Sequence, residues 1–137
     1  MDEANLSRLS KLNDMEHVML NHWLETHDIK LDRHTRNQFR DALAIARVFE
    51  KIHPEVVDLH SYTPRSSVAR MVENWKIFNV RVLNKLNMDI TQTDMQQLAT
   101  GAEGAVESLL YDLMVADYSL LMRGDAQKQF NQPHSVD

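Results

Sequence analysis

The sequence predicts an all-α fold, and three observations support this prediction. Apolar residues recur at spacings of three and four along most of the chain, which is the period of an amphipathic helix. Alternation of apolar and polar residues, the pattern of a strand, is nowhere sustained. The 137 residues include only three glycines and three prolines, too few for the many turns of a sheet. We therefore expect one compact bundle of about five to six helices.

The N-terminal segment, residues 1–13, is expected to be an extension of the helical domain. Its three leucines fall at a spacing of three, at Leu6, Leu9 and Leu12. This spacing fits either a helical turn lying against the domain or a loosely ordered arm, and the sequence leaves both interpretations open.

The first predicted helix begins after Asn13 or Asp14, because short polar side chains bind the free amide groups at a helix start. It runs to about Thr26, and the interruption at 27–31 predicts a loop. Its apolar stripe consists of Met15, Val18, Met19, Trp23 and Leu24.

A second helix is predicted over about 33–52, with Asp32 as its cap. Pro54 ends it, because proline disfavours helical geometry in the residue before it. The most regular helix is predicted over about 68–87, after Ser66 or Ser67. Its apolar stripe is wide enough for a central core helix and includes Val68, Met71, Val72, Trp75, Phe78, Val82, Leu83 and Leu86.

The C-terminal part predicts two further helices. Thr93 and Gln96 match a capping box, which starts a short helix ending near Thr100. The last helix is expected over about 105–123, with Gly124 just after its end. Its expected buried face is Val106, Leu109, Leu110, Leu113, Met114 and Leu121. We assign residues 14–124 to the helical domain and 125–137 to a polar tail.

The sequence predicts no catalytic site, metal site or cofactor. There is no cysteine, hence no disulfide or thiol chemistry, and no phosphate-binding loop, nucleophile elbow or zinc-protease motif. His17, His22 and His27 are five apart, so successive rings point about 140° apart around a helix and cannot meet at one ion. The chain is not expected to be an enzyme.

The charged residues are unevenly distributed. The net charge of −5 argues against nucleic-acid binding, and no apolar run approaches the length of a membrane span. The segment 65–88 nevertheless carries +4, whereas 89–125 carries −6. Seven basic residues are candidates for a surface that docks on an acidic polymer: Arg33, Arg36, Arg40, Arg65, Arg70, Arg81 and Lys85.

Helical spacing groups six of these seven residues. The three arginines between residues 33 and 40 share a helix face by spacings of three and four. The three basic residues of the 68–87 helix lie within about 60° of one another at about 100° per residue. A solvated face without a partner is the alternative interpretation, and the docking hypothesis requires the basic residues to share one side of the protein.

Several segments resemble one family, the calponin-homology domain of the sperm flagellar protein 1 (CLAMP) family. Residues 39–54, FRDALAIARVFEKIHP, resemble the calponin-homology pattern, although Ala42 stands where the family has glycine. LHSYTP at 59–64 resembles the family segment LHNYxP. Asn74-Trp75 with VLNKLN at 82–87 resembles its NW…VLNKLN helix, and GAVESLL at 104–110 resembles GVVELVL. The resemblance covers about residues 17–122.

The resemblance implies a binding domain without enzymatic activity. It implies tubulin in microtubules as the partner, and a place in the cytoplasm, on the cytoskeleton of a cilium or flagellum axoneme or of the cell cortex. We assign the motif residues His60, Tyr62, Asn74 and Trp75 mainly to packing and loop anchoring. Family members carry a coiled coil after this domain, so dimerisation is expected only through segments outside this chain. An adaptor that binds another axonemal protein through an apolar groove remains the alternative, and actin binding is a third.

Overall fold

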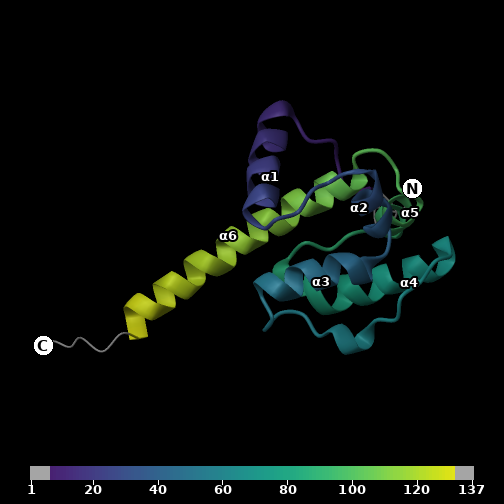
Figure 1. Ribbon diagram of the computed structural model, residues 1–137. Coiled ribbons are helices and arrows are strands. Elements are labelled where there is room, and N and C mark those ends of the chain that lie inside the picture. The colour runs from purple at the N-terminus through teal and green to yellow at the C-terminus, as the bar shows by residue number, and fades with distance from the viewer. Residues whose placement is uncertain (1–6, 132–137) are drawn as a thin grey trace, which may run out of the picture.

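The computed structural model describes residues 7–131, with side chains as far as Gly124. Over this part the chain forms six α-helices, short 3-10 and π segments, and no strand, which confirms the predicted all-α fold. The longest element is α6 (Ala105–Asn131), and α1 (Asp14–Thr26) packs across it. In Figure 1, α3 (Ala42–Ile52) and α4 (Val68–Phe78) lie next to each other on the other side of α6.

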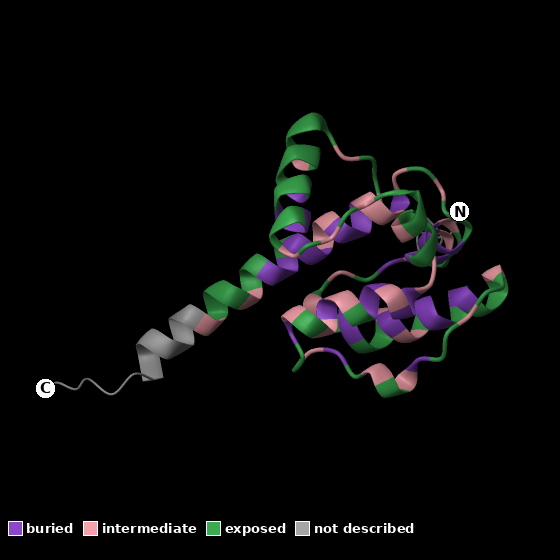
Figure 2. Ribbon diagram, in the orientation of Figure 1, coloured by how far each residue is buried: buried purple, intermediate pink, exposed green. Residues whose placement is uncertain are grey.

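The core forms where these helices meet, and aromatic side chains fill much of it. Trp23, Phe49, Trp75 and Phe78 are fully buried, which confirms the predicted burial of both tryptophans. Each indole N–H has an acceptor, as a buried donor requires. Trp23 Nε1 donates to Asp117 Oδ2 at 2.8 Å, and Trp75 Nε1 donates to the Arg40 carbonyl at 2.8 Å. Figure 2 shows the buried faces turned toward one another.

Helix α1 begins as predicted, but fewer of its apolar residues are buried than predicted. Asn13 caps it in a capping box, in which Asn13 accepts from the Glu16 amide and Glu16 accepts from the Asn13 amide. Its buried residues are Leu20, Trp23 and Leu24. Met15, Val18 and Met19, which the stripe predicted to be buried, are exposed. The reason is visible in Figure 2: only the C-terminal half of α1 packs on α6.

The single helix predicted over 33–52 is two helices, so this prediction is wrong. Helix α2 (Arg33–Gln38) is capped by Asp32 as predicted, but a new helix, α3, starts after Asp41. Two contacts explain the break. The Arg40 carbonyl, which a continuous helix would bond to the Ala44 amide, accepts instead from the Trp75 indole. The Asp41 carboxylate accepts from the Leu43 amide and thereby caps α3.

The long helix predicted over 68–87 is one continuous helical stretch with three geometries. Ser67 caps α4, and the stretch continues through the π turn η3 (Asn79–Leu83) into the 3-10 turn η4 (Asn84–Leu86). Asn87, in the left-handed conformation with φ 59°, ends it. A π turn changes the angular step per residue. The grouping of Arg70, Arg81 and Lys85 within about 60°, which assumed one regular α-helix, stays a prediction.

Helix α5 (Gln92–Thr100) starts two residues earlier than predicted, because Thr91 and not Thr93 is its cap. Thr91 Oγ1 accepts from the Asp94 amide at 3.1 Å, and the Asp94 carboxylate accepts from the Thr91 amide at 2.9 Å. Gly101, at φ 76°, ends α5 in a left-handed conformation that suits glycine.

Asp94 also fastens the N-terminal arm to the domain. Its carboxylate accepts from the Ser7 hydroxyl and from the amides of Arg8 and Leu9. These hydrogen bonds outweigh burial and hold the pKa of Asp94 below its usual value. From Ser7 the arm is therefore non-helical and anchored; Leu6 lies outside the described residues.

Helix α6 is longer than predicted. It passes through Gly124 and ends at Asn131, so the predicted end at Arg123 is wrong. A glycine inside a helix costs only about 1 kcal/mol, which the surrounding turns tolerate. Leu109, Leu110, Leu113 and Met114 are buried as predicted, but Leu121 is exposed because α6 extends beyond the other helices there (Figure 1). Among the described helices, none has the length and apolarity required to cross a membrane.

Candidate docking surface

Helix α3 presents a second face, turned away from the core, that is only partly polar. Its core-facing residues are Ala42, Leu43, Ile45, Ala46 and Phe49. On the other side, Ala44, Val48 and Ile52 recur at a spacing of four and are half-buried. Arg47 and Lys51, also four apart, run alongside them and are exposed. This face therefore carries an apolar strip with two cations beside it.

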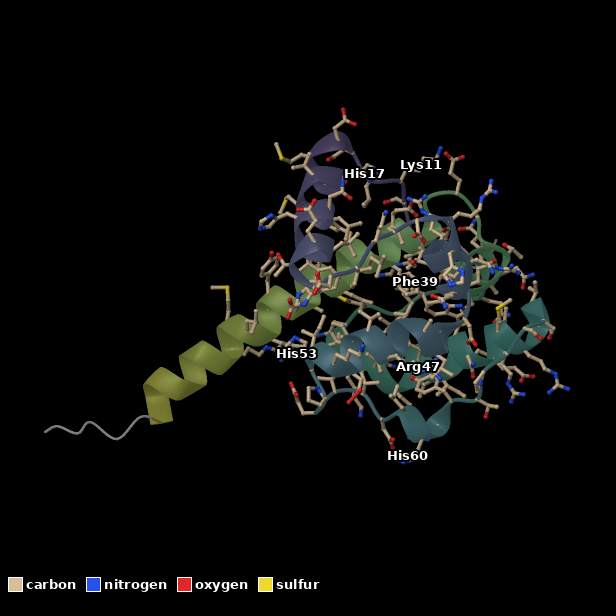
Figure 3. The ribbon with its side chains drawn as sticks, in the orientation of Figure 1. Lys11, His17, Phe39, Arg47, His53 and His60 are labelled. Carbon is tan, nitrogen blue, oxygen red and sulfur yellow. The ribbon has the colours of Figure 1, made fainter. Side chains whose placement is uncertain are left out.

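Two open hollows follow this face of α3 and meet at shared residues. The first, of about 490 Å³, lies between the α2–α3 connection, α3 and the Pro64–Ser66 loop. The second, of about 560 Å³, extends toward the 27–30 loop. Gln38, Phe39 and Val48 line both hollows, so the two form one groove, which we call the α3 groove. Figure 3 labels Phe39 and Arg47, two of its lining residues.

Basic side chains outnumber acidic ones along the α3 groove. The acidic ones are Asp28 and Asp41. The five basic ones are Lys30, Arg40, Arg47, Lys51 and Arg65. In the part of the chain described, none of the five lies within 4.0 Å of a carboxylate in an ion pair. The groove is thus a positively charged region on an acidic protein.

Two of these five residues are anchored by hydrogen bonds, Arg40 through its side chain and Arg65 through its backbone amide. Arg40 Nε donates to the Ala99 carbonyl at 2.8 Å, and Nη1 donates to Asn37 Oδ1 at 3.2 Å. The backbone amide of Arg65 donates to Asp41 Oδ2 at 2.9 Å, while its buried Nε has no hydrogen-bond partner among the described residues. The Arg40 guanidinium is therefore held by hydrogen bonds, whereas in Arg65 it is the backbone that is held.

Asp41 forms part of the wall of the groove, and its carboxylate is used in hydrogen bonds to neighbouring segments. Besides the Leu43 and Arg65 amides, its carboxylate accepts from Asn74 Nδ2 at 2.7 Å. Asn74 is buried and also donates to the Thr63 carbonyl at 2.8 Å. Both carboxylate oxygens are thus used to join α3, α4 and the 63–65 loop.

The seven predicted docking residues lie at several places. Arg40 and Arg65 both line the α3 groove, and Arg36 and Arg40 both line a smaller hollow beside the start of α6. Arg36, on α2, pairs with Glu107 at the start of α6, with Nη2 and Oε2 3.1 Å apart. Arg33 is exposed on α2, Arg70 at the start of α4, and Lys85 on η4. Arg40 lies just beyond the end of α2, yet it lines one hollow together with Arg36, so two of the three arginines predicted to share a face lie side by side.

Arg81 lies near a different loop, the one that contains η2 (Leu59–Ser61). Burial raises the pKa of Tyr62 to about 12, and the positive charge of Arg81 opposes this rise. Asp58 accepts a hydrogen bond from the His60 backbone amide, which together with the His60 side chain and Arg81 holds the pKa of Asp58 below its usual value. Arg81 therefore belongs to the η2 side and not to the α3 groove.

The family-motif residues have the packing and anchoring roles expected of them, with one exception. Asn74 and Trp75 are buried and hydrogen-bonded, and Tyr62 is buried. His60 is fully exposed, and its Nδ1 lies 2.8 Å from Asp58 Oδ1. It contributes to the turn and not to packing.

Three groove cations were absent from the predicted set: Lys30, Arg47 and Lys51. Arg47 and Lys51 share a spacing of four, and that spacing also relates Ala44, Val48 and Ile52. The sequence pattern could have identified the face, but the long helix assumed over 33–52 obscured which face remains uncovered. Within the described residues, no group of three histidine, aspartate or glutamate side chains is placed to hold a metal ion.

Comparison with known proteins identifies the family. Residues 20–115 match the model of the family described as the CH-like domain in sperm protein. Sperm flagellar protein 1 of Bos taurus is 35% identical over 94 residues, which cover 66% of this chain and 39% of that protein. The Mus musculus and Homo sapiens proteins of the same name are each 33% identical over 94 residues, with the same coverage. The matched region is thus well under half of these relatives. The chain belongs to the family of CH-like domains in sperm proteins.

Proposed function

We propose that this chain is a microtubule-binding calponin-homology domain of a ciliary, flagellar or cortical microtubule-associated protein, without enzymatic activity. Docking is electrostatic, between exposed basic side chains and the acidic surface of tubulin. Membership of this family supports the proposal, because its relatives are named sperm flagellar protein 1.

The observation that carries the proposal is the number of positive charges left without a compensating carboxylate. Of the seven predicted docking residues, only Arg36 forms an ion pair in the described part of the chain. Cations of this kind accelerate association with an acidic surface, and their effect weakens as salt screens them. Because the chain is net negative, docking has to use local basic regions.

The test is co-sedimentation with microtubules across a salt series, using the variant Arg70→Glu with Lys85→Glu. Both side chains are exposed, and a glutamate at position 70 lies three residues after the cap Ser67, where it completes a capping box. We expect strong binding at low salt that fades as salt rises, and a loss of about tenfold in affinity for the variant. Arg36 is unsuitable for charge reversal, because a glutamate there would face Glu107.

The matched control is Lys76→Glu with Arg123→Glu, which changes the net charge equally at exposed positions outside the predicted set. The control should bind within about twofold of the original protein. Absence of the folded protein from the microtubule pellet at low salt would contradict the proposal, and so would equal losses in the two variants.

The apolar strip of Ala44, Val48 and Ile52 favours the second candidate, an adaptor that binds another axonemal protein through an apolar groove. Salt separates the two functions, because burial of apolar surface persists at ionic strengths that screen exposed charges. Actin binding is the third candidate, and pelleting with actin filaments tests it directly.

A further inference from the structure

The α3 groove combines basic side chains, which favour a negatively charged ligand, with an apolar strip, which favours an apolar one. Its five basic side chains, with Arg47 and Lys51 exposed and unpaired in the described part of the chain, attract negative charge. Its strip of Ala44, Val48 and Ile52 beside Phe39 offers apolar surface that a purely charged ligand leaves uncovered. A ligand that satisfies both carries carboxylates and a large apolar side chain.

From this juxtaposition we infer that the α3 groove is a peptide-binding site for an acidic segment of a partner protein that contains a large apolar residue. The carboxylates of the segment contact Arg47 and Lys51 on α3, with Arg40 and Arg65 at one end and Lys30 at the other. The apolar residue packs on the strip between Ala44 and Val48. The inference goes beyond microtubule docking and does not depend on it.

Charge and shape select the peptide over other acidic ligands. The groove is elongated, since its two hollows extend from the Pro64–Ser66 loop to the 27–30 loop, and a small anion would occupy only one of them. Nucleic acid usually stacks its bases on exposed aromatic rings. The aromatic residue that lines both hollows, Phe39, is buried, with 4% of its surface exposed. A chain of alternating acidic and apolar side chains matches the lining more completely.

Hydrogen bonds within the protein also prepare the groove for a peptide. The Arg40 guanidinium is held by the Ala99 carbonyl, so one charge is already placed before binding, and the Arg65 backbone is held by Asp41. Positions fixed in advance reduce the conformational entropy lost on binding. Arg47 and Lys51, four residues apart on one helix face, supply the adjustable contacts.

The test is fluorescence anisotropy with a short fluorescein-labelled glutamate-rich peptide that contains one phenylalanine. We expect saturable binding to the folded chain, and about a tenfold loss of affinity for the variant Arg47→Glu with Lys51→Glu. The control Lys76→Glu with Arg123→Glu has the same net charge and should bind within about twofold of the original protein. Replacing the peptide's phenylalanine by serine should weaken binding by at least about threefold.

A second variant guards against loss of folding. Ala44→Glu places a carboxylate in the groove at the third position of α3, where an acidic residue favours the helix dipole. Circular dichroism should show an intact fold while peptide binding falls. The inference is overturned if both double variants lose affinity equally, if the serine peptide binds as well as the phenylalanine peptide, or if a single-stranded oligonucleotide binds more tightly than the peptide.

Microtubule pelleting of the same proteins separates this inference from the proposed function. A chain that pellets with microtubules but does not bind the peptide overturns the groove and leaves microtubule binding in place. A chain that binds the peptide but does not pellet with microtubules supports the groove and contradicts microtubule binding.

Discussion

His53 and Asp117, which are 64 positions apart in sequence, meet in the core with His53 Nε2 and Asp117 Oδ1 only 2.6 Å apart. Both residues are buried, and the other carboxylate oxygen of Asp117 accepts from Trp23 Nε1 at 2.8 Å. Asp117 on α6 therefore joins α1 to the end of α3. A polar group in the core is tolerated only when it is hydrogen-bonded, as both side chains are here.

Removing this carboxylate should strongly destabilise the fold. Asp117→Ala leaves the Trp23 indole and the His53 ring without their buried partner, at a cost of about 3 kcal/mol in the free energy of unfolding. Urea unfolding followed by circular dichroism measures this cost. The control is Val115→Ala on the same helix, where the exposed side chain should change stability by less than about 0.5 kcal/mol. Equal effects of the two substitutions would show that Asp117 is not a structural link.

Asp112 should make stability depend on pH in the opposite sense to most carboxylates. Burial, with the nearby charge of Asp94, raises the pKa of Asp112 to about 6. The contribution of Asp112 to the free energy of unfolding is fully present below the unfolded pKa of about 3.9. This contribution is lost as pH rises through the folded pKa of about 6. Asp112→Asn should therefore raise the free energy of unfolding at pH 7.5 by about 1 kcal/mol, after allowance for partial solvent screening.

The same substitution gives its own control at low pH. At about pH 4 the original side chain is protonated in the folded protein, so Asp112→Asn should have little effect there. Urea unfolding at both pH values makes the comparison. A variant that is equally stabilised at both would mean that the ionisation of Asp112 is not the cause.

Local chemistry predicted the starts of three helices, but it placed the cap of α5 at Thr93 when Thr91 is the cap. Asp32 was predicted as a cap, and Asn13 and Ser67 were each one of two candidates, because a short polar side chain binds amides within its own first turn. The break at Arg40 was missed because its cause, the indole of Trp75, lies 35 positions away in sequence. The exposed half of α1 was missed for a similar reason, since the stripe shows which side is apolar but not how far a partner helix covers it.

The candidate site was predicted only in part. Arg40 and Arg65 were named, and they meet in the α3 groove although neither lies on a helix. Arg36 was named as a free charge, but Glu107 from a distant helix neutralises it. Ion pairs between distant segments cannot be read from spacing along one helix. Arg47 and Lys51 were missed because α2 and α3 were predicted as one helix. The side of α3 that faces solvent could not be identified from that longer helix.

The break between α2 and α3 leads to a prediction about Asp41. Asp41→Ala removes three hydrogen bonds at once, from the Leu43 amide, the Arg65 amide and Asn74 Nδ2. We expect a loss of about 2–3 kcal/mol in the free energy of unfolding. Asp32→Ala is the matched control. Asp32 is an exposed cap whose hydrogen bonds, within the described residues, are to Thr35 in its own first helical turn, and its loss should cost about 1 kcal/mol or less. A smaller loss at Asp41 than at Asp32 would contradict its role in joining α3, α4 and the 63–65 loop.

Gly124 offers a test of how α6 continues beyond the core. The helix passes through this residue, and apart from its own helix backbone a methyl group there would meet no described atom within 4 Å. Alanine is favoured over glycine inside a helix by about 1 kcal/mol, so Gly124→Ala should slow amide hydrogen exchange in the residues around it by about fivefold. The matched control is Gly101→Ala, at φ 76°, where a side chain is strained and stability should fall. If exchange near residue 124 is unchanged or faster in the alanine variant, α6 ends before this glycine in solution, as its sequence alone had predicted.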